Sequence, residues 1–331
     1  MNQQAGAKRF GGVVVPMVTP FTADGQLDEP AVRWIIEHLI GGEVAGVFIL
    51  GTTGENASIA PATRARLVAV VVEQVRSRAM IYVGVSDTCI ANSIAASEEY
   101  TGMGVDACVA HLPPYYSLTP EEQFTYFATL AERISAPLMI YNIPSTTHMS
   151  IPIEVVKRLA GRPNVIGLKD SERNEERLEN VLRTLGGRDD FTILVGATLY
   201  TGKGLALGAN GSVPSVGNLT PGLCQRLHEC GVAGDRDGAD HYQRLVDEVG
   251  QIYQRGRTLG QSLGALKAAM GVFGLCEAYV LPPLTTPDLA EQQAVREECR
   301  SLQKSWWPGP YVGDLHEKAE KIGDGSTLCE G

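Results

Sequence analysis

The feature that most constrains the fold is an eightfold alternation of two sequence patterns along the chain. Short apolar runs, rich in valine and isoleucine, have the length and composition of buried β-strands. The longer stretches between them place apolar residues every three or four positions, which is the pattern of an amphipathic helix. The strand-like runs cover residues 12–18, 46–50, 80–86, 107–113, 137–143, 165–169, 191–196 and 211–215.

This alternation predicts an α/β protein with the architecture of a (β/α)8 TIM barrel, in which eight parallel strands close into a cylinder surrounded by helices. An open doubly wound sheet is the alternative. That fold would carry a GxGxxG motif after its first strand, and the chain has none there. The clearest helical stretches between the strands are 31–40, 62–75, 121–134 and 153–160.

The chain of 331 residues continues well beyond the eighth strand. One more helix is expected to close the barrel, so we predict a barrel domain over residues 1–232. Further helical patterns predict a C-terminal helical subdomain over residues 233–303, and the weakly periodic segment 304–331 is expected to form a C-terminal tail. The helical patterns after the eighth strand lie at 221–230, 238–255, 260–274 and 287–303.

Charge and composition narrow the class of partner. A net charge of −10, without any run of five or six basic residues, argues against a nucleic acid or an anionic membrane. No apolar stretch approaches the ~20 residues of a membrane span, and the first ten residues lack a signal-peptide core. Seven cysteines without a CxxC pair and six histidines without HxH or HxxH spacing disfavour disulfides and metal-dependent chemistry. We expect a cytoplasmic protein that acts on small molecules without a cofactor.

In (β/α)8 barrels the C-terminal ends of the strands carry the functional side chains, and the sixth strand here ends in a lysine. In "VIGLKDSE" (165–172), a period of two places Lys169 on the opposite side of the strand from Ile166 and Leu168. If those branched residues face the helices, the amine points into the barrel mouth. Desolvation there lowers its pKa and produces a nucleophile that can form a Schiff base with a ketone. A lysine that snorkels, or that pairs with the carboxylate at 170 or 172, is the alternative. The same period assigns Val165 and Gly167 to the side of the lysine.

A tyrosine closes the neighbouring strand. In "PLMIYNI" (137–143) the alternation turns Tyr141 into the barrel, and neighbouring parallel strands lie ~4.8 Å apart, so its phenol can meet the amine of Lys169. Schiff-base chemistry needs a group that shuttles protons, which a tyrosine can supply. A core tyrosine with a satisfied hydroxyl is the alternative.

The loop "GTTGEN" (51–56), directly after the second strand, has the composition of an anion-binding turn. Its two glycines permit a tight turn that exposes backbone N–H groups, while Thr52 and Thr53 add hydroxyl donors. Together these groups could hold a carboxylate. The same residues also occur in ordinary turns, so the motif alone is weak.

Four short motifs in this order resemble the dihydrodipicolinate synthase and N-acetylneuraminate lyase family: "GTTGE" (51–55), "PYY" (114–116), "YNIP" (141–144) and "GLKD" (167–170). The similarity extends from about residue 10 to about residue 300. It implies a (β/α)8 barrel with a C-terminal helical part. It also implies a Schiff-base lyase for pyruvate or another 2-oxo acid, without a cofactor and usually assembled as a homotetramer of two tight dimers.

The resemblance also implies roles for individual residues. Lys169 matches the Schiff-base lysine and Tyr141 the catalytic tyrosine. Thr52 and Thr53 match the threonines that bind the substrate carboxylate. Tyr116 matches a tyrosine that reaches into the neighbouring subunit's site and completes a proton relay, although packing beside a proline turn is an alternative for this residue.

Departures from the family pattern bear on the substrate. Dihydrodipicolinate synthases resemble "PSRTG" after the tyrosine motif, where the arginine holds the carboxylate of aspartate semialdehyde. This chain has Thr146 and His148 in place of the arginine and the glycine. A neutral threonine cannot replace a bidentate guanidinium. The stretch "VGATLYTG" (195–202) also lacks the acidic pair associated with sialic acid recognition.

The "KDS" context resembles aldolases that act on 2-keto-3-deoxy sugar acids or 4-hydroxy-2-oxo acids. We therefore predict a lyase that joins pyruvate to an aldehyde or cleaves the product. A dihydrodipicolinate synthase and a 2-keto-3-deoxy acid dehydratase are the alternatives, and a 2-oxo acid sensor is a more distant one. The polar residues that could line such a substrate pocket are Thr146, His148, Thr198 and Ser212, each of which could equally have a structural role.

Overall fold

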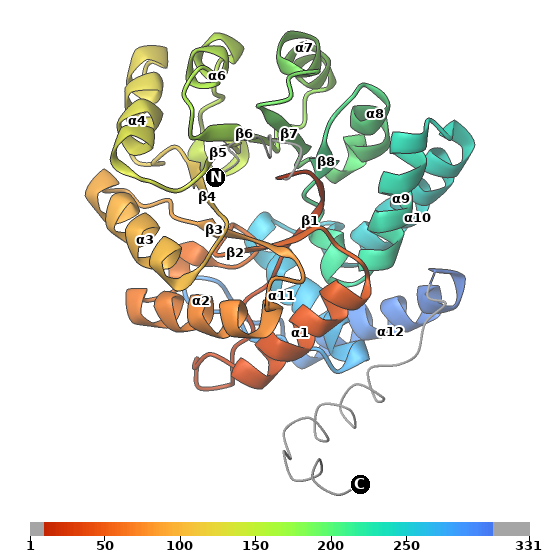
Figure 1. Cartoon of the computed structure of the whole chain (residues 1–331). Coiled ribbons are helices and arrows are strands. Elements are labelled where there is room, and N and C mark those ends of the chain that lie inside the picture. Colours follow the sequence, from red (N-terminus) through yellow and green to blue (C-terminus); the bar gives the residue numbers. More distant parts are fainter. Residues whose placement is uncertain (1–9, 307–331) are drawn as a thin grey trace, which may run out of the picture.

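Eight parallel strands form a closed barrel inside a ring of helices in the computed structural model, which describes residues 10–306 (Figure 1). Each strand pairs with its neighbours in chain order, and the last pairs with the first. The predicted TIM-barrel fold is confirmed. The strands are β1 (Gly12–Pro16), β2 (Gly46–Ile49), β3 (Met80–Gly84), β4 (Ala107–His111), β5 (Leu138–Asn142), β6 (Val165–Asp170), β7 (Thr192–Val195) and β8 (Gly211–Ser212).

The helices around the barrel begin at residues that suit helix starts. Asp28 caps α1 through its side chain, and Thr119 and Glu122 form a reciprocal capping box at α4. Proline stands in the first turn of both helices, where its missing N–H costs no hydrogen bond. The helices of this layer are α1 (Glu29–Gly41), α2 (Pro61–Val75), α3 (Ile90–Met103), α4 (Pro120–Arg133), α5 (Pro144–Thr147), α6 (Ile153–Leu159), α7 (Glu175–Leu185), α8 (Thr201–Ala206) and α9 (Pro221–Ala233).

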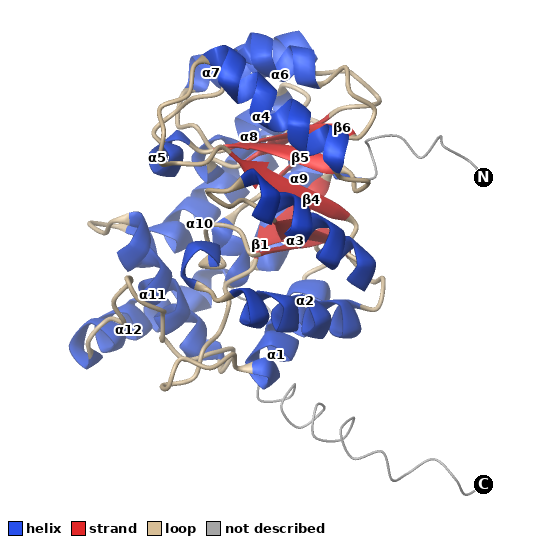
Figure 2. Ribbon diagram, turned by 90° about the vertical axis from the view of Figure 1, so that its left-hand side faces the viewer, coloured by secondary structure: helices blue, strands red, loops and turns tan. Residues whose placement is uncertain are grey.

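Three further helices, α10 (Arg236–Gln254), α11 (Leu259–Met270) and α12 (Leu289–Trp306), follow the barrel. Figure 2 shows them on the same side of the barrel as α5, the short helix that directly follows β5. Every residue of α11 from Ser262 to Met270 is buried, because this helix packs between the barrel, α10 and α12. The predicted division at residues 232 and 303 stays a prediction. Helix α12 continues past the second boundary, and residues 307–331 of the predicted tail lie outside the described part of the chain.

The core has two layers. Inward-facing residues such as Phe48, Tyr82 and Met139 fill the barrel, and a larger apolar cluster joins the outer face of the strands to the helices. This arrangement directs the polar groups at the strand ends to one open side of the barrel.

A β-bulge corrects the predicted side-chain alternation in β6. Leu138 pairs with Val165 and Met139 with Gly167, so Ile166 has no partner in β5. Ile166 therefore joins the barrel interior and Val165 the outer core, opposite to the expectation, whereas Leu168 faces outward as predicted. A Cβ atom on Gly167 would lie 2.3 Å from the carbonyl oxygen of Thr192, which explains the glycine. Beyond the bulge, Lys169 lies in register beside Tyr141.

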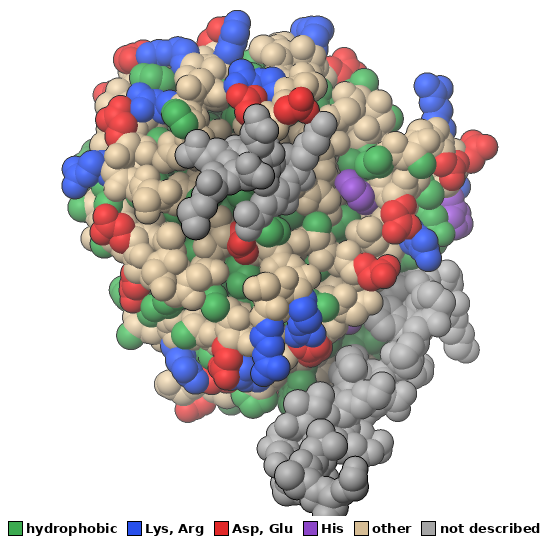
Figure 3. Space-filling model, viewed as in Figure 1, with side chains coloured by type: hydrophobic (Ala, Val, Ile, Leu, Met, Phe, Trp, Pro, Cys, Tyr) green, Lys and Arg blue, Asp and Glu red, His purple; other side chains and the backbone are tan. Residues whose placement is uncertain are grey.

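Acidic and basic side chains are interspersed on the face shown in Figure 3. Within residues 10–306, no helix is both long and apolar enough to cross a bilayer.

Candidate active site

Lys169 is a buried amine without a carboxylate partner among the residues that the structure describes. Only 4% of its surface is exposed. Its Nζ lies 3.7 Å from the centroid of the Tyr141 ring and 4.6 Å from that of Phe48. Burial lowers the pKa of this amine, and the hydroxyl of Tyr141 opposes that shift. The arrangement increases the fraction of neutral, nucleophilic amine at a given pH.

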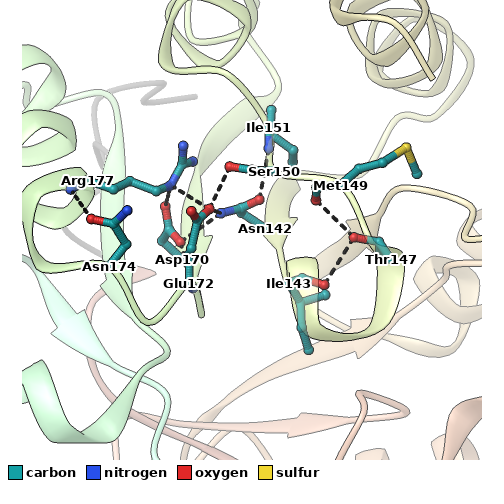
Figure 4. Close-up of polar contacts among 10 residues, drawn as sticks. All are labelled: Asn142, Ile143, Thr147, Met149, Ser150, Ile151, Asp170, Glu172, Asn174 and Arg177. Atoms are coloured by element: carbon teal, nitrogen blue, oxygen red, sulfur yellow. Dashed lines mark hydrogen bonds and ion pairs between the residues drawn. The ribbon is translucent and has the colours of Figure 1, made fainter. Parts of the chain in front are cut away.

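The carboxylates next to Lys169 are bound elsewhere, so the alternative of a simple ion pair for this lysine is wrong. Asp170 pairs with Arg177 at 2.8 Å, and Glu172 lies 3.3 Å from the same guanidinium. Asn142 donates hydrogen bonds to both carboxylates, at 2.9 and 3.0 Å (Figure 4). Neither acid is then available to raise the pKa of the lysine.

The same polar network fixes the backbone after β5 and β6. Asn142 accepts a hydrogen bond from the N–H of Ile151 at 3.0 Å, and Ser150 donates to Glu172 at 2.6 Å. Asn174 caps α7 by accepting from the N–H of Arg177 at 3.0 Å (Figure 4). Both strand ends are thereby held in one geometry, as a site that must position reacting groups requires.

Tyr141 joins the lysine to the loop after β2. Its hydroxyl lies 3.5 Å from Oγ1 of Thr52, at the outer limit of a hydrogen bond. On its other side, the ring of His111 lies 6.1 Å away, in an edge-to-face arrangement. His111, Tyr141 and Lys169 lie in register near the ends of the adjacent strands β4, β5 and β6, which explains why their side chains converge.

A buried ion pair connects the "GTTGE" loop to helix α11. Glu55 adopts a left-handed backbone conformation with φ of 57° and is bound by Lys267 of α11 and by the N–H of Leu281 at 3.0 Å. The lysine also donates to the carbonyl oxygen of Tyr279 at 2.7 Å. The carbonyl oxygen of Gly54 accepts a hydrogen bond from Thr19 at 2.8 Å. Thr52 and Thr53 are therefore displayed on a loop that both the barrel and α11 support.

A cavity of about 670 Å³ opens above these groups. Its floor contains Lys169, Tyr141, Thr52 and Thr53, as expected from the sequence, and Thr198 lies on its wall. Its roof comes from the end of α10 and the start of α11. Sequence analysis missed several lining residues; the polar ones among them are Ser145, Ser171, Arg173, Ser215, Asp247, Gln251, Tyr253, Gln254, Arg255, Arg257, Thr258 and Ser262.

Three predicted substrate-binding residues lie outside the lining of this cavity. Thr146 donates its hydroxyl to the carbonyl oxygen of Ile143 within α5, and His148 is an exposed residue at the end of that helix. Ser212 faces outward from β8 into a small pocket against α8 and α9. Helix α5 turns Thr146 and His148 away from the cavity. The alternation of side chains along the short strand β8 turns Ser212 outward. The geometry does not support their predicted roles.

Tyr116 also lies away from the cavity lining. Its side chain is 70% exposed and packs edge to face on Tyr115, with ring centroids 4.9 Å apart. The two tyrosines together present an exposed aromatic surface beside a proline turn.

The fold and the buried lysine beside a tyrosine agree with a match to a family model. The model of the dihydrodipicolinate synthetase family matches residues 9–302. The chain belongs to this family. Dihydrodipicolinate synthetase family members are class I, pyruvate-dependent lyases and aldolases that form a lysine Schiff base, and the chain is accordingly an enzyme of this type.

The names of similar proteins describe both aldolases and dihydrodipicolinate synthases. YagE of Escherichia coli K12, whose name describes it as a candidate 2-dehydro-3-deoxy-D-gluconate aldolase, is 30% identical over 282 residues, covering 84% of this chain and 92% of YagE. Its crystal structure in complex with pyruvate has a TM-score of 0.83, covering 89% of this chain and 99% of that one. Dihydrodipicolinate synthase from Bacteroides thetaiotaomicron is 30% identical with a TM-score of 0.84, covering 88% and 98% of the two chains. The family therefore includes both the predicted aldolase activity and the synthase alternative.

Proposed function

We propose that the protein is a pyruvate aldolase that acts on 2-keto-3-deoxy sugar acids or 4-hydroxy-2-oxo acids, with Lys169 as the Schiff-base residue. The observation that carries the assignment is a buried amine with lowered pKa, free of carboxylates among the described residues, beside a tyrosine on the cavity floor. Lys267, the other buried lysine among the described residues, is occupied by Glu55.

The mechanism follows from this geometry. The neutral amine of Lys169 attacks the C2 ketone of the substrate, and water leaves to give a protonated imine. Tyr141 gives its proton to the hydroxyl that leaves as water, and the resulting phenolate then takes the proton of the C4 hydroxyl. The C3–C4 electron pair moves into the imine as the aldehyde departs, and Tyr141 can return the proton to C3 of the enamine. Hydrolysis of the resulting imine releases pyruvate and restores the amine. Thr52 and Thr53 hold the C1 carboxylate, which fixes C2 in front of the lysine.

The substrate assignment is supported by the absence of an arginine at position 146. Dihydrodipicolinate synthases resemble a pattern with an arginine there, which holds the carboxylate of aspartate semialdehyde. In this chain Thr146 instead donates its hydroxyl to the carbonyl oxygen of Ile143, the residue before α5. The likeness to YagE points in the same direction, because its name describes a sugar-acid aldolase. The dihydrodipicolinate synthase alternative is supported by the likeness to proteins of that name.

We further propose a cytoplasmic homotetramer built from two tight dimers, in which Tyr116 completes the site of the neighbouring subunit. The exposure of the stacked tyrosine pair supports a contact there. The small-molecule reactants fit the cavity volume, which is within the range of ordinary ligand pockets.

Borohydride trapping tests the function. Pyruvate plus borohydride should attach a reduced adduct to Lys169, located by peptide mass mapping, and Lys169→Ala should remove both the adduct and turnover. Lys203→Ala is the matched control, because that lysine is ion-paired to Glu175 and Glu179 on the outer surface. A stoichiometric adduct on Lys203 or any other lysine would refute the assignment.

A coupled assay over a panel of aldehydes separates the three activities. Glyceraldehyde should be a better acceptor for pyruvate than aspartate semialdehyde. A clear preference for aspartate semialdehyde would restore the synthase. A trapped pyruvate imine with no aldehyde accepted would indicate a dehydratase.

A further inference from the structure

Arg173 stands out among the cations of the cavity because its charge is not compensated. Three arginines line the cavity. Arg255 lies 3.4 Å from Glu298, and Arg257 pairs with Glu291 at 2.8 Å. Arg173 is an exposed residue of the cavity lining, and within the described part of the chain it has no carboxylate partner and no side-chain hydrogen bond. A full positive charge is therefore available to whatever occupies this part of the cavity.

The carboxylates nearest to Arg173 in sequence already have other partners. Asp170 and Glu172 are bound by Arg177 and Asn142, and Ser150 adds a further hydrogen bond to Glu172 (Figure 4). Asp247 is the single carboxylate among the described residues of the cavity lining, and it accepts a hydrogen bond from Gln243 at 2.9 Å. The cavity thus combines an uncompensated guanidinium with little local negative charge.

The backbone that carries Arg173 is held on both sides. The preceding residue, Glu172, is fixed by the network in Figure 4, and the following residue, Asn174, is the cap of α7. Such support fixes the backbone position from which the side chain of Arg173 extends. Arg173 follows Lys169 by four residues, so its Cα lies at most about 13 Å from that of the lysine at ~3.3 Å per extended residue. Both side chains line the same cavity, so they can contact opposite ends of one small molecule.

We propose that Arg173 binds an acidic group on the terminal carbon of the substrate, so that the preferred acceptor is a hydroxyaldehyde with a terminal phosphate or carboxylate. This inference rests on the proposed aldolase function and narrows its substrate class. The C1 carboxylate of the 2-oxo acid occupies the Thr52 and Thr53 loop, the ketone faces Lys169, and the second acidic group pairs with the guanidinium. Arginine suits either anion because its planar fork donates two parallel hydrogen bonds.

The experiment compares acceptors that differ only at the terminal carbon. Values of kcat/KM for condensation with pyruvate are measured for glyceraldehyde, glyceraldehyde 3-phosphate and tartronate semialdehyde. The wild-type enzyme should prefer an acidic acceptor over glyceraldehyde, and the better of the two acids identifies phosphate or carboxylate. Arg173→Gln should lower kcat/KM for that acid about 10-fold to 100-fold and leave glyceraldehyde within about threefold. Arg173→Lys should recover part of the loss, because it keeps the charge without the fork.

Arg183→Gln is the matched control, since it removes an exposed cation of α7 whose partner is Asn180, and it should leave all three acceptors unchanged. Calorimetric binding of 3-phosphoglycerate, tartronate and glycerate to the pyruvate-loaded enzyme gives the same comparison without turnover. If Arg173→Gln changes kcat/KM equally for charged and neutral acceptors while pyruvate still labels Lys169, the inference about Arg173 is wrong and the proposed aldolase function stands. Failure of pyruvate to label Lys169 in the wild-type enzyme would overturn both proposals.

Discussion

Replacing Lys267 by methionine should destabilise the protein far more than breaking an ion pair at its surface. Lys267 and Glu55 have fully buried side chains, and they connect α11 to the loop after β2. Methionine is similar in length to lysine and adapts to its surroundings, so the packing changes little. The electrostatics change greatly, because Glu55 keeps only the N–H of Leu281 as a partner among the described residues.

The size of the effect follows from these contacts. Removing one member of a buried ion pair costs about 3–5 kcal/mol, since the remaining charge stays in a poorly solvated interior. The loss of the hydrogen bond to the carbonyl oxygen of Tyr279, at 2.7 Å, adds about 1 kcal/mol. We therefore expect a decrease of about 4–6 kcal/mol in the free energy of unfolding. The KM for pyruvate should also rise, because Glu55 supports Thr52 and Thr53.

Urea-induced unfolding at pH 7, followed by far-ultraviolet circular dichroism, measures the loss. The control is Lys157→Met, whose ammonium lies 3.8 Å from Glu154 on the exposed face of α6 and which should change the stability little. The double variant Glu55→Gln with Lys267→Met removes both charges and should recover much of the stability. Equal stabilities for Lys267→Met and Lys157→Met would refute the reasoning.

Three further outcomes are expected. Lys169→Met should abolish turnover yet match or exceed the wild type in unfolding free energy at pH 7, by urea titration. The reason is that burial lowers the pKa of this amine in the folded protein. Between that lowered pKa and the ordinary lysine pKa of 10.5, the unfolded chain binds more protons, so the stability of the wild type rises with pH there. Methionine should remove that slope. Gly167→Ala should cost about 1–3 kcal/mol, because its Cβ would meet the Thr192 carbonyl oxygen at 2.3 Å; an unchanged urea midpoint would contradict the bulge. Tyr116→Phe should slow turnover without changing the sedimentation coefficient, and hybrids with Lys169→Ala chains should regain activity if the tyrosine acts across the subunit boundary.

The parts of this enzyme that the sequence predicted are those set by local patterns. Apolar strand-like runs alternating with amphipathic helical stretches identified the barrel, and the strand-end rule located Lys169 and Tyr141. The bulge at Ile166 could not be predicted in this way, because it is defined by how β6 pairs with β5 and not by the residues of β6 alone. The same strand-end rule would have indicated His111, which ends β4 beside Tyr141.

Contacts between distant segments account for the remaining differences. Glu55 and Lys267 are 212 residues apart, and no local pattern relates them. The roof of the cavity comes from α10 and α11, whose amphipathic pattern indicates a helix but not where it packs. Thr146 and His148 follow a strand that sequence analysis located correctly, yet the short helix α5 turns them out of the cavity.

The roof has a consequence for how the enzyme is made and how it can diverge. Residues 251–259, which cover the reacting groups, are synthesised after all eight strands and lie in a separate stretch of the chain. The reacting groups and the cover above them are thus encoded in separate stretches of the gene. Mutations in the later stretch can reshape the space above the imine while the earlier stretch preserves the carbon–carbon bond chemistry.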